Sequence, residues 1–213
     1  MSRPMDVAYC FIKEKILDGT FKPSQKLNEI ELSTSIGVSR NTVKKALLKL
    51  QQEQLVEVQS NKGANVKSYT LEEVVNYMEI REVLEVLVAV DASSNITDTE
   101  INKLSETLHK MEEHLQNNRF DEYSKLNKAF HQIIYDTCTN KQAVEMVNII
   151  KTQLARFHIR TILVPGRNKN SYAEHRAILE ALKSGDEELV AQAIKTHLSN
   201  VRKTIQEHSS LLL

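Results

Sequence analysis

The sequence predicts a mainly α-helical protein, with three helices and a small β-hairpin at the N-terminus followed by an all-α antiparallel bundle of about six to seven helices. Only five of its 213 residues are Gly and three are Pro, while 5% are aromatic and none is Trp. Long segments repeat apolar residues every three or four positions, which is the period of an amphipathic helix, and few segments alternate as strands do. A hydrophobic content of 41% with 26% charged residues is ordinary for a globular protein that buries a core.

The first two helices are bounded by residues that favour helix ends. Apolar side chains at helical spacing predict a helix over residues 7–17, and the segment FKPSQKL that follows is expected to be a turn. Asn28 is placed to cap a second helix over residues 29–35, with Glu31 completing a capping box. Gly37 is expected to end that helix, because glycine readily adopts the left-handed conformation found after helix C-termini.

A third helix and a hairpin complete the N-terminal region. Ser39 is expected to cap the helix that begins at Arg40 and that buries its apolar residues on one face. The segments LVEV and ANVKS flank QSNKG, which predicts a β-hairpin with Gly63 at positive φ. The order helix, helix-turn-helix, hairpin is that of a winged helix-turn-helix domain, which we place at residues 1–69.

The polar face of the third helix begins with side chains that suit DNA. Arg40 can pair with guanine in the major groove, and Asn41 or Thr42 can reach adenine or the thymine methyl group. Residues 1–67 hold 11 Lys and Arg against 7 Asp and Glu, so of the chain's 28 and 28 the remaining residues hold 17 and 21. A solvated basic helix is the alternative, and the order of the elements favours DNA binding over it. The residues expected to contact DNA are Ser39, Arg40, Asn41, Thr42, Lys44, Lys45, Lys26, Lys62 and Gly63.

The segment ILDGTFKPSQKLNEIELSTSIGVSRNTVKKALLKLQQEQLVEVQSNKGANV resembles the DNA-binding domain of the GntR family of transcription regulators. Gly19, Pro23 and the GVSR of residues 37–40 are among the matching landmarks. Thr42 departs from the Pro that the family often has, and Lys44-Lys45 departs from Arg-Glu. The resemblance implies a homodimer that binds double-stranded operator DNA, and the departures concern the preferred DNA sequence.

Residues 70–213 are expected to form a second, all-helical domain for effector binding and dimerisation. A long helix is predicted to begin near Leu71 and to end at the segment SNITD. The loops between the helices are short, which favours an antiparallel bundle. The further helices are expected over residues 99–117, 119–138, 140–163, 171–183 and 186–208.

Three of the seven histidines have a spacing that brings them together. Asn127 and His131 stand four residues apart and therefore share a helix face. His175 lies ten residues before Gly185 and His197 lies twelve after it, so a helical hairpin that turns at Gly185 places them side by side. Three imidazoles and an amide oxygen could hold a divalent metal such as zinc, nickel or manganese. The alternative for any lone histidine is a solvated or purely structural role.

The segments IREVLE, KLNKAFHQIIYDTCTN and EHRAILEALKSGDEELVAQAIKTHL resemble the ligand-binding FCD domain of the FadR subgroup of GntR regulators. The resemblance implies a metal held by an Asp and three His, and a small carboxylate held by the metal. His131, His175 and His197 match those histidines, whereas Asn127 stands at the usual Asp position. Arg81 matches an Arg that would pair with the effector, and an intrahelical pair with Glu85 is its alternative role. The weaker effector-binding candidates are Tyr123, Arg160 and Arg167.

These expectations describe a transcriptional regulator, acting as a repressor, whose operator binding is controlled by a small carboxylate. One alternative is a constitutive DNA-binding regulator whose metal and effector site has degraded at Asn127. A metallohydrolase with a DNA-targeting module is another, but no HExxH or comparable acid-base motif accompanies the histidines. We therefore expect no enzymatic activity and no organic cofactor.

The N-terminus and the cysteines predict a cytoplasmic protein without a membrane partner. The segment MSRPMDVAYCF lacks a long apolar stretch, and no run of about 18 apolar residues occurs in the chain. Cys10 and Cys138 are far apart and form no CxxC motif, which favours a reducing compartment.

Overall fold

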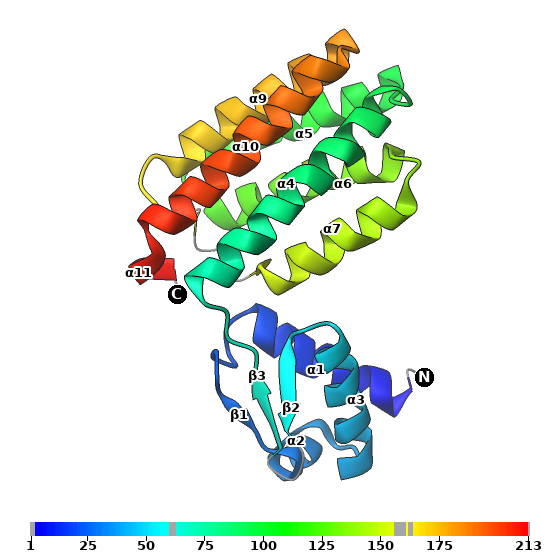
Figure 1. Ribbon diagram of the computed structural model, residues 1–213, viewed down its shortest axis with the longest axis vertical. Helices are drawn as coiled ribbons and strands as arrows, with labels where there is room; N and C mark the ends of the chain where they lie inside the picture. The colour runs from blue at the N-terminus through cyan, green and yellow to red at the C-terminus, as the bar shows by residue number, and fades with distance from the viewer. Residues whose placement is uncertain (1–2, 60–62, 156–160, 162–163, 213) are drawn as a thin grey trace. The chain divides into compact units, whose positions relative to one another are not determined.

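The computed structural model describes residues 3–59, 63–155, 161 and 164–212, and it divides the chain into two compact units. One unit consists mainly of residues 1–70 and the other mainly of residues 71–213 (Figure 1). The first combines helices with a small sheet, and the second is helical throughout the described residues. The predicted mainly α fold is confirmed. Within the described residues, no helix has both the length and the apolar character needed to cross a bilayer.

The N-terminal unit has the three predicted helices and the predicted hairpin in the predicted order, with one further strand between the first two helices. Its helices and strands are α1 (Pro4–Leu17), β1 (Lys26–Leu27), α2 (Glu29–Ile36), α3 (Arg40–Gln52), β2 (Val56–Gln59) and β3 (Gly63–Val66). Its core is made of side chains from all three helices and from the sheet, among them the fully buried Ile12, Val43 and Leu50. This core fixes α3 against α1 and α2 and leaves the opposite face of α3 exposed.

Local hydrogen bonds explain where α2 and α3 begin and end. The side-chain oxygen of Asn28 accepts a hydrogen bond from the backbone N–H of Ile30 at 2.9 Å. Glu31 accepts from the Asn28 side-chain amide at 3.0 Å, and not from its backbone, so only half of the expected capping box forms. Gly37 has a φ of +77° and ends α2 as predicted, and the Ser39 hydroxyl oxygen accepts from Thr42 N at 3.1 Å at the start of α3.

The sheet has three strands in the order β1-β3-β2, all antiparallel, where the sequence predicted two. The extra strand lies in FKPSQKL, which was expected to be only a turn. Lys26 pairs with Asn65 and Leu27 with Ala64, and Leu27 is 2% exposed. Two residues are too few to show a period-2 pattern in the sequence, so this strand depends on its pairing with β3.

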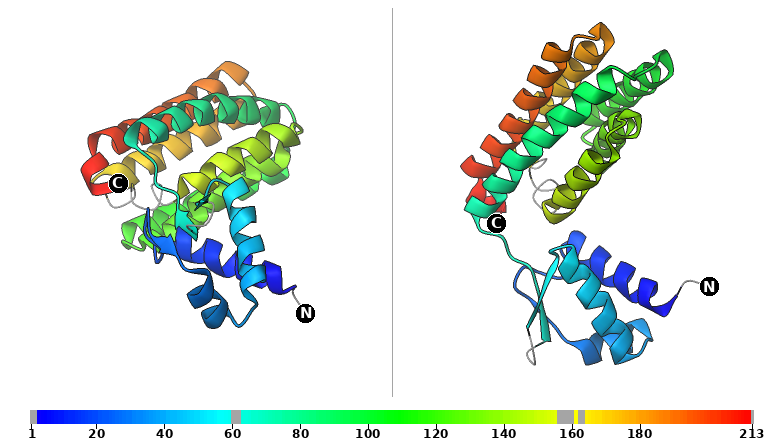
Figure 2. Two further views of the ribbon diagram at one scale, coloured as in Figure 1. Left: turned by 60° about the horizontal axis from the view of Figure 1, so that its bottom comes forward. Right: turned by 45° about the vertical axis from the view of Figure 1, so that its right-hand side comes forward.

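The helical unit is an antiparallel bundle (Figures 1 and 2). Its described helices are α4 (Leu71–Ser93), α5 (Asp98–Gln116), α6 (Phe120–Thr137), α7 (Lys141–Gln153), α9 (Arg167–Ser184), α10 (Glu187–Glu207) and α11 (Ser209–Leu212). Helix α4 packs against α10 and α6, α5 packs against α6 and α9, and α9 packs against α10. These contacts bring α6, α9 and α10, which carry the three histidines, to one core.

Three predicted helix boundaries differ from the structure by three residues or more. Helix α1 begins at Pro4, three residues before the predicted start. The helix expected over residues 140–163 is described as α7 only to Gln153. Helix α9 begins at Arg167, four residues before the predicted start, because Gly166 adopts a φ of +79° immediately before it. The turn between α9 and α10 is where the sequence placed it: Gly185 has a φ of +69°, and Asp186 caps α10 by accepting from Glu188 N at 2.9 Å.

Candidate DNA interface and candidate metal centre

The exposed face of α3 carries the basic and polar side chains that the sequence assigned to DNA. Arg40, Asn41, Lys44 and Lys45 are all exposed. The Nε of Arg40 donates to Glu29 Oε2 at 2.7 Å, and the Arg40 side chain is still 67% exposed. That bond uses one of the five N–H groups of the guanidinium, so its terminal nitrogens face solvent at the start of the helix.

Other residues assigned to DNA have structural roles as well. Ser39 caps α3, and its hydroxyl lies 2.8 Å from the hydroxyl of the half-buried Thr42. Lys26 is exposed on β1, and Gly63 begins β3 with a φ of +90°. Lys62 lies outside the described residues. The exposed cations on α3 and β1 belong to the same compact unit. That unit can therefore use them together to contact phosphates of the DNA backbone.

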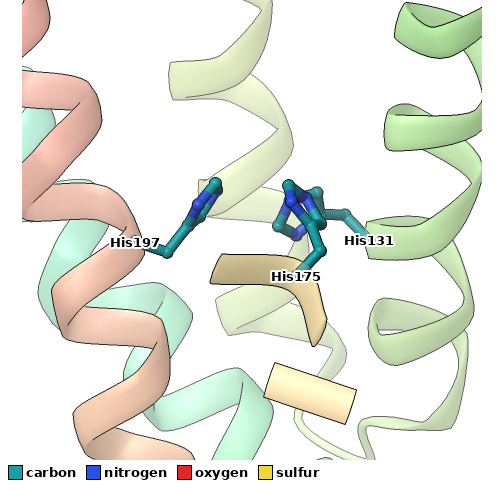
Figure 3. Close-up of side chains that lie close together, drawn as sticks. All are labelled: His131, His175 and His197. Carbon is teal, nitrogen blue, oxygen red and sulfur yellow. The ribbon is translucent and has the colours of Figure 1, made fainter. Parts of the chain in front are cut away.

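Three helices bring the three predicted histidines together. His131 comes from α6, His175 from α9 and His197 from α10 (Figure 3). One ring nitrogen from each lies within 4.8 Å of the others, and the side chains are buried. The ring centroid of His175 is 5.0 Å from that of His131 and 4.7 Å from that of His197.

Two of these rings donate a hydrogen bond from Nδ1, and this bond fixes the direction in which each ring presents its Nε2. His175 Nδ1 donates to the carbonyl of Ser171 at 2.6 Å, and His197 Nδ1 donates to Glu174 Oε2 at 2.7 Å. Burial lowers the pKa of His175 to about 3, so this imidazole is neutral and its Nε2 carries a lone pair. Nδ1 hydrogen bonds of this kind orient histidines that bind metals through Nε2.

The centre of the cluster brings electron-pair donors face to face. His175 Nε2 lies 2.9 Å from the side-chain oxygen of Asn127 and 3.1 Å from His131 Nε2. A neutral His175 with its proton on Nδ1 cannot donate to that oxygen, so two acceptors meet there. A cation at this point would bind both lone pairs, and the residues present therefore fit a divalent metal.

A second layer of charged residues holds the cluster in place. Glu174 receives two hydrogen bonds from Arg167, at 3.1 and 2.8 Å, and one from Asn200 Nδ2 at 2.9 Å. Burial alone would raise the pKa of Glu174, but the hydrogen bond from His197 and the charge of Arg167 lower it. The carboxylate therefore stays ionised and keeps His197 Nδ1 as a donor. On the other side of the cluster, Glu85 Oε2 lies 3.8 Å from His131 Nδ1.

Arg81 forms the intrahelical pair that its spacing allowed. Its Nε lies 2.5 Å from Glu85 Oε1, and both residues are 1% exposed. Burial alone would raise the pKa of Glu85, but Arg81 lowers it, so the pair is ionised. Arg81 therefore stands behind His131, with Glu85 between them, and its contact with an effector stays a prediction.

Of the weaker candidates, Tyr123 lies beside the histidine cluster. It is fully buried, its hydroxyl interacts with Ser171, and burial raises its pKa to about 12. Arg167 acts on the cluster through Glu174. Arg160 lies outside the described residues. Tyr123 and Arg167 thus border the residues that orient His175 and His197.

Sequence reasoning missed the residues that orient the histidines. The carbonyl of Ser171 lies four residues before His175. Every histidine in a helix has a backbone carbonyl at that position, so the sequence does not distinguish this one. Glu174 precedes His175 in the chain but contacts His197 on the next helix, which only the register of α9 against α10 reveals.

Two family models match the chain. The model described as bacterial regulatory proteins, gntR family, matches residues 4–66, and the FCD domain model matches residues 76–200. The HTH-type transcriptional regulator YdhC of Bacillus subtilis (strain 168) is 27% identical over 193 residues, which cover 90% of this chain and 86% of YdhC. The HTH-type transcriptional repressor RspR of Escherichia coli (strain K12) is 24% identical over 199 residues, which cover 93% of this chain and 87% of RspR.

A solved structure shows the same fold. The structure of E. coli McbR/YncC matches with a TM-score of 0.79 at 20% identity, and the match covers 98% of this chain and 100% of McbR/YncC. The fold is therefore shared over 98% of this chain.

The Arg81–Glu85 pair yields a stability prediction. Glu85→Leu is expected to destabilise the helical unit by about 3–5 kcal/mol, because it removes the carboxylate beside a buried guanidinium. The double variant Arg81→Met with Glu85→Leu is expected to recover much of that loss, since an apolar pair of similar size needs no partner. Urea unfolding followed by circular dichroism measures both changes. A double variant no more stable than Glu85→Leu alone would contradict this account of the pair.

Proposed function

The chain belongs to the gntR family of bacterial regulatory proteins and carries an FCD domain, and on that premise we propose that it represses transcription as a homodimer under the control of a small carboxylate. It is a DNA-binding transcriptional regulator and not an enzyme, which removes the metallohydrolase alternative. The finer parts of the proposal concern the metal, the effector, the residues that contact DNA and the dimer. Each is supported by a different part of the described structure.

The observation that carries the effector proposal is the meeting of lone pairs among the histidines. His131, His175 and His197 would hold a divalent metal through ring nitrogens, with the Asn127 oxygen as a fourth ligand. Zinc, nickel or manganese would supply a Lewis-acidic centre with open positions for a carboxylate. All four protein ligands are uncharged, so the centre keeps the full charge of the ion and attracts an anion.

The alternative of a degraded site rests on the same residue. An amide oxygen is a weaker ligand than the carboxylate that the family usually has at this position. Asn127 nevertheless points its oxygen at His175 Nε2 at 2.9 Å, which is the direction a ligand needs. We therefore propose a working site with Asn127 as a ligand, in preference to a constitutive regulator.

Exposed apolar side chains on the helical unit support the proposal of a homodimer. Five large apolar residues are exposed on α4 and α7, and we name them the α4–α7 surface: Ile80 (52%), Val83 (71%), Leu87 (48%), Met146 (57%) and Ile149 (45%). On α4 these residues follow helical spacing along one face, and both helices lie on the viewer's side of the bundle in Figure 1. A second copy would cover this surface and place two α3 helices on two operator half-sites.

Effector binding would act on DNA through the dimer. A carboxylate can change operator affinity only by the difference in its affinity for the two arrangements of the dimer. Glu85 on α4 lies 3.8 Å from His131, and Lys151 on α7 donates to the hydroxyl of Tyr135 on α6. The helices that carry the proposed dimer surface therefore adjoin the proposed site.

The metal proposal predicts that one substitution increases the affinity for zinc. Asn127→Asp is expected to bind zinc more tightly than the wild type, because a carboxylate is a stronger ligand and offsets part of the metal charge. His175→Ala is expected to lose zinc binding, and Asn102→Asp, at an exposed position on α5, should behave like the wild type. Isothermal titration with zinc measures all four proteins. Zinc binding by Asn127→Asp alone would support the degraded site instead.

The DNA proposal separates two kinds of contact. Arg40→Ala is expected to cost about 1–3 kcal/mol of affinity for an operator selected from random duplexes, and to relax the preference at one base pair. Lys45→Ala should weaken binding to any duplex and lower the salt dependence by about one unit, because it removes one phosphate contact. Fluorescence anisotropy at several salt concentrations measures both effects. Equal weakening of operator and random DNA by Arg40→Ala would exclude base readout by Arg40.

The dimer proposal predicts a change in association. Val83→Glu is expected to weaken the dimer at least tenfold, about 1.4 kcal/mol, because a charge would be buried in the α4–α7 surface. Leu189→Glu is the matched control, since Leu189 is 53% exposed on α10 outside that surface. Sedimentation equilibrium gives the dissociation constants. A Val83→Glu protein that dimerises like the wild type would show that the two copies meet elsewhere.

A further inference from the structure

Lys151 lies in the last turn of α7 beside the histidine cluster, and the proposed function gives it no role. It is partly buried, and its ammonium donates to the Tyr135 hydroxyl at 3.2 Å. The same ammonium stands 4.4 Å from the centroid of the Tyr135 ring. Tyr135 in turn lies beside His131, with 6.1 Å between the two ring centroids. One aromatic side chain therefore separates Lys151 from a proposed metal ligand.

The charges around Lys151 do not balance within the described residues. Arg81 and Lys151 are two cations, and Glu85 is the carboxylate that faces both of them. Glu85 is bound directly by Arg81 at 2.5 Å, whereas Tyr135 stands between Glu85 and Lys151. Burial raises the pKa of Tyr135 well above its ordinary value, so the phenol adds no negative charge. Arg81, Lys151 and Glu85 together therefore keep one positive charge in excess.

The neighbouring cluster cannot supply the missing anion. Neither the imidazole of His131 nor the amide of Asn127 carries a negative charge. The charge of Glu174 is matched by Arg167, which binds it with two hydrogen bonds. A bound metal would add further positive charge. The region thus combines low solvent access with a surplus of cations, which favours a ligand that brings more than one negative charge.

Within the described residues, Lys151 forms its hydrogen bond with the Tyr135 hydroxyl and has no ion pair with a carboxylate. Burial lowers the pKa of Lys151 to about 8, although the attraction of Glu85 acts in the opposite direction. A lysine with a full ionic partner would not lose its proton so readily. If its only task were to pack on Tyr135, the aliphatic stem of an uncharged residue would serve equally well.

We propose that Lys151 binds a second anionic group of the effector, so that the regulator selects a dicarboxylate over a monocarboxylate. This inference rests on the proposed function, in which the first carboxylate binds at the three histidines and Asn127. Because both anchors adjoin Tyr135, the diacid has a short chain. Lys151 then determines the preference for a diacid, and the affinity for a monocarboxylate does not depend on it.

The test compares ligands that differ by one charge. Malonate, succinate and glutarate are each titrated against their own monoamide, which keeps the length and removes one carboxylate. Isothermal titration uses the full-length protein, purified without chelator, as wild type, Lys151→Met and Lys128→Met. Lys128 is exposed on α6 and contributes to the same local field, so its variant controls for the loss of a nearby charge.

The expected result is a wild type that binds one of the diacids about 10- to 100-fold more tightly than its monoamide. Lys151→Met should bind the diacid no better than the monoamide and bind the monoamide as the wild type does, which also shows that its pocket is folded. Lys128→Met should keep the wild-type preference.

Two results would overturn the inference in distinguishable ways. A wild type that binds these acids without preferring a diacid, or a Lys151→Met protein that keeps the preference, refutes the role of Lys151 and leaves the carboxylate effector standing. A wild type that binds none of the diacids or monoamides overturns the inference of a short dicarboxylate effector, and titration with hydroxy acids and sugar acids then tests the wider carboxylate class separately.

Discussion

The geometry of the histidine cluster in the helical unit depends on the hydrogen bonds that fix two of its three rings. The Ser171 carbonyl and the Glu174 carboxylate hold the Nδ1 protons of His175 and His197, so both rings turn Nε2 inward. The proposed metal would offset the cost of burying these ring nitrogens in the core. Arg167, Asn200 and the turn at Gly185 all serve to keep this geometry.

Helices α4 and α7 connect the proposed site with the proposed dimer. Their outer faces expose the apolar α4–α7 surface, and their other residues include Arg81, Glu85 and Lys151 beside His131. A ligand that changes the position of Lys151 or Glu85 would act on helices that also carry the proposed dimer surface. This gives the coupling a physical route through packed helices, and it requires no contact between the effector and the DNA-binding unit.

The sequence predicted those features that depend on local chemistry or on counting along a helix. Asn28, Gly37 and Ser39 mark helix ends because their side chains or backbones satisfy specific hydrogen bonds, and the structure has them in those roles. Counting from Gly185 placed His175 beside His197, since two helices joined by a short turn keep their register. Strand β1 and the bond from His197 to Glu174 escaped prediction, because each depends on a partner distant in sequence or on a neighbouring helix.

The most direct test of the account is elemental analysis by mass spectrometry of the protein purified without chelator, alongside a variant with His131→Ala and His175→Ala. The account predicts close to one divalent metal ion per chain in the wild type and none in the variant. A wild type that contains no metal, and that also fails to take up added zinc, nickel or manganese, would contradict it.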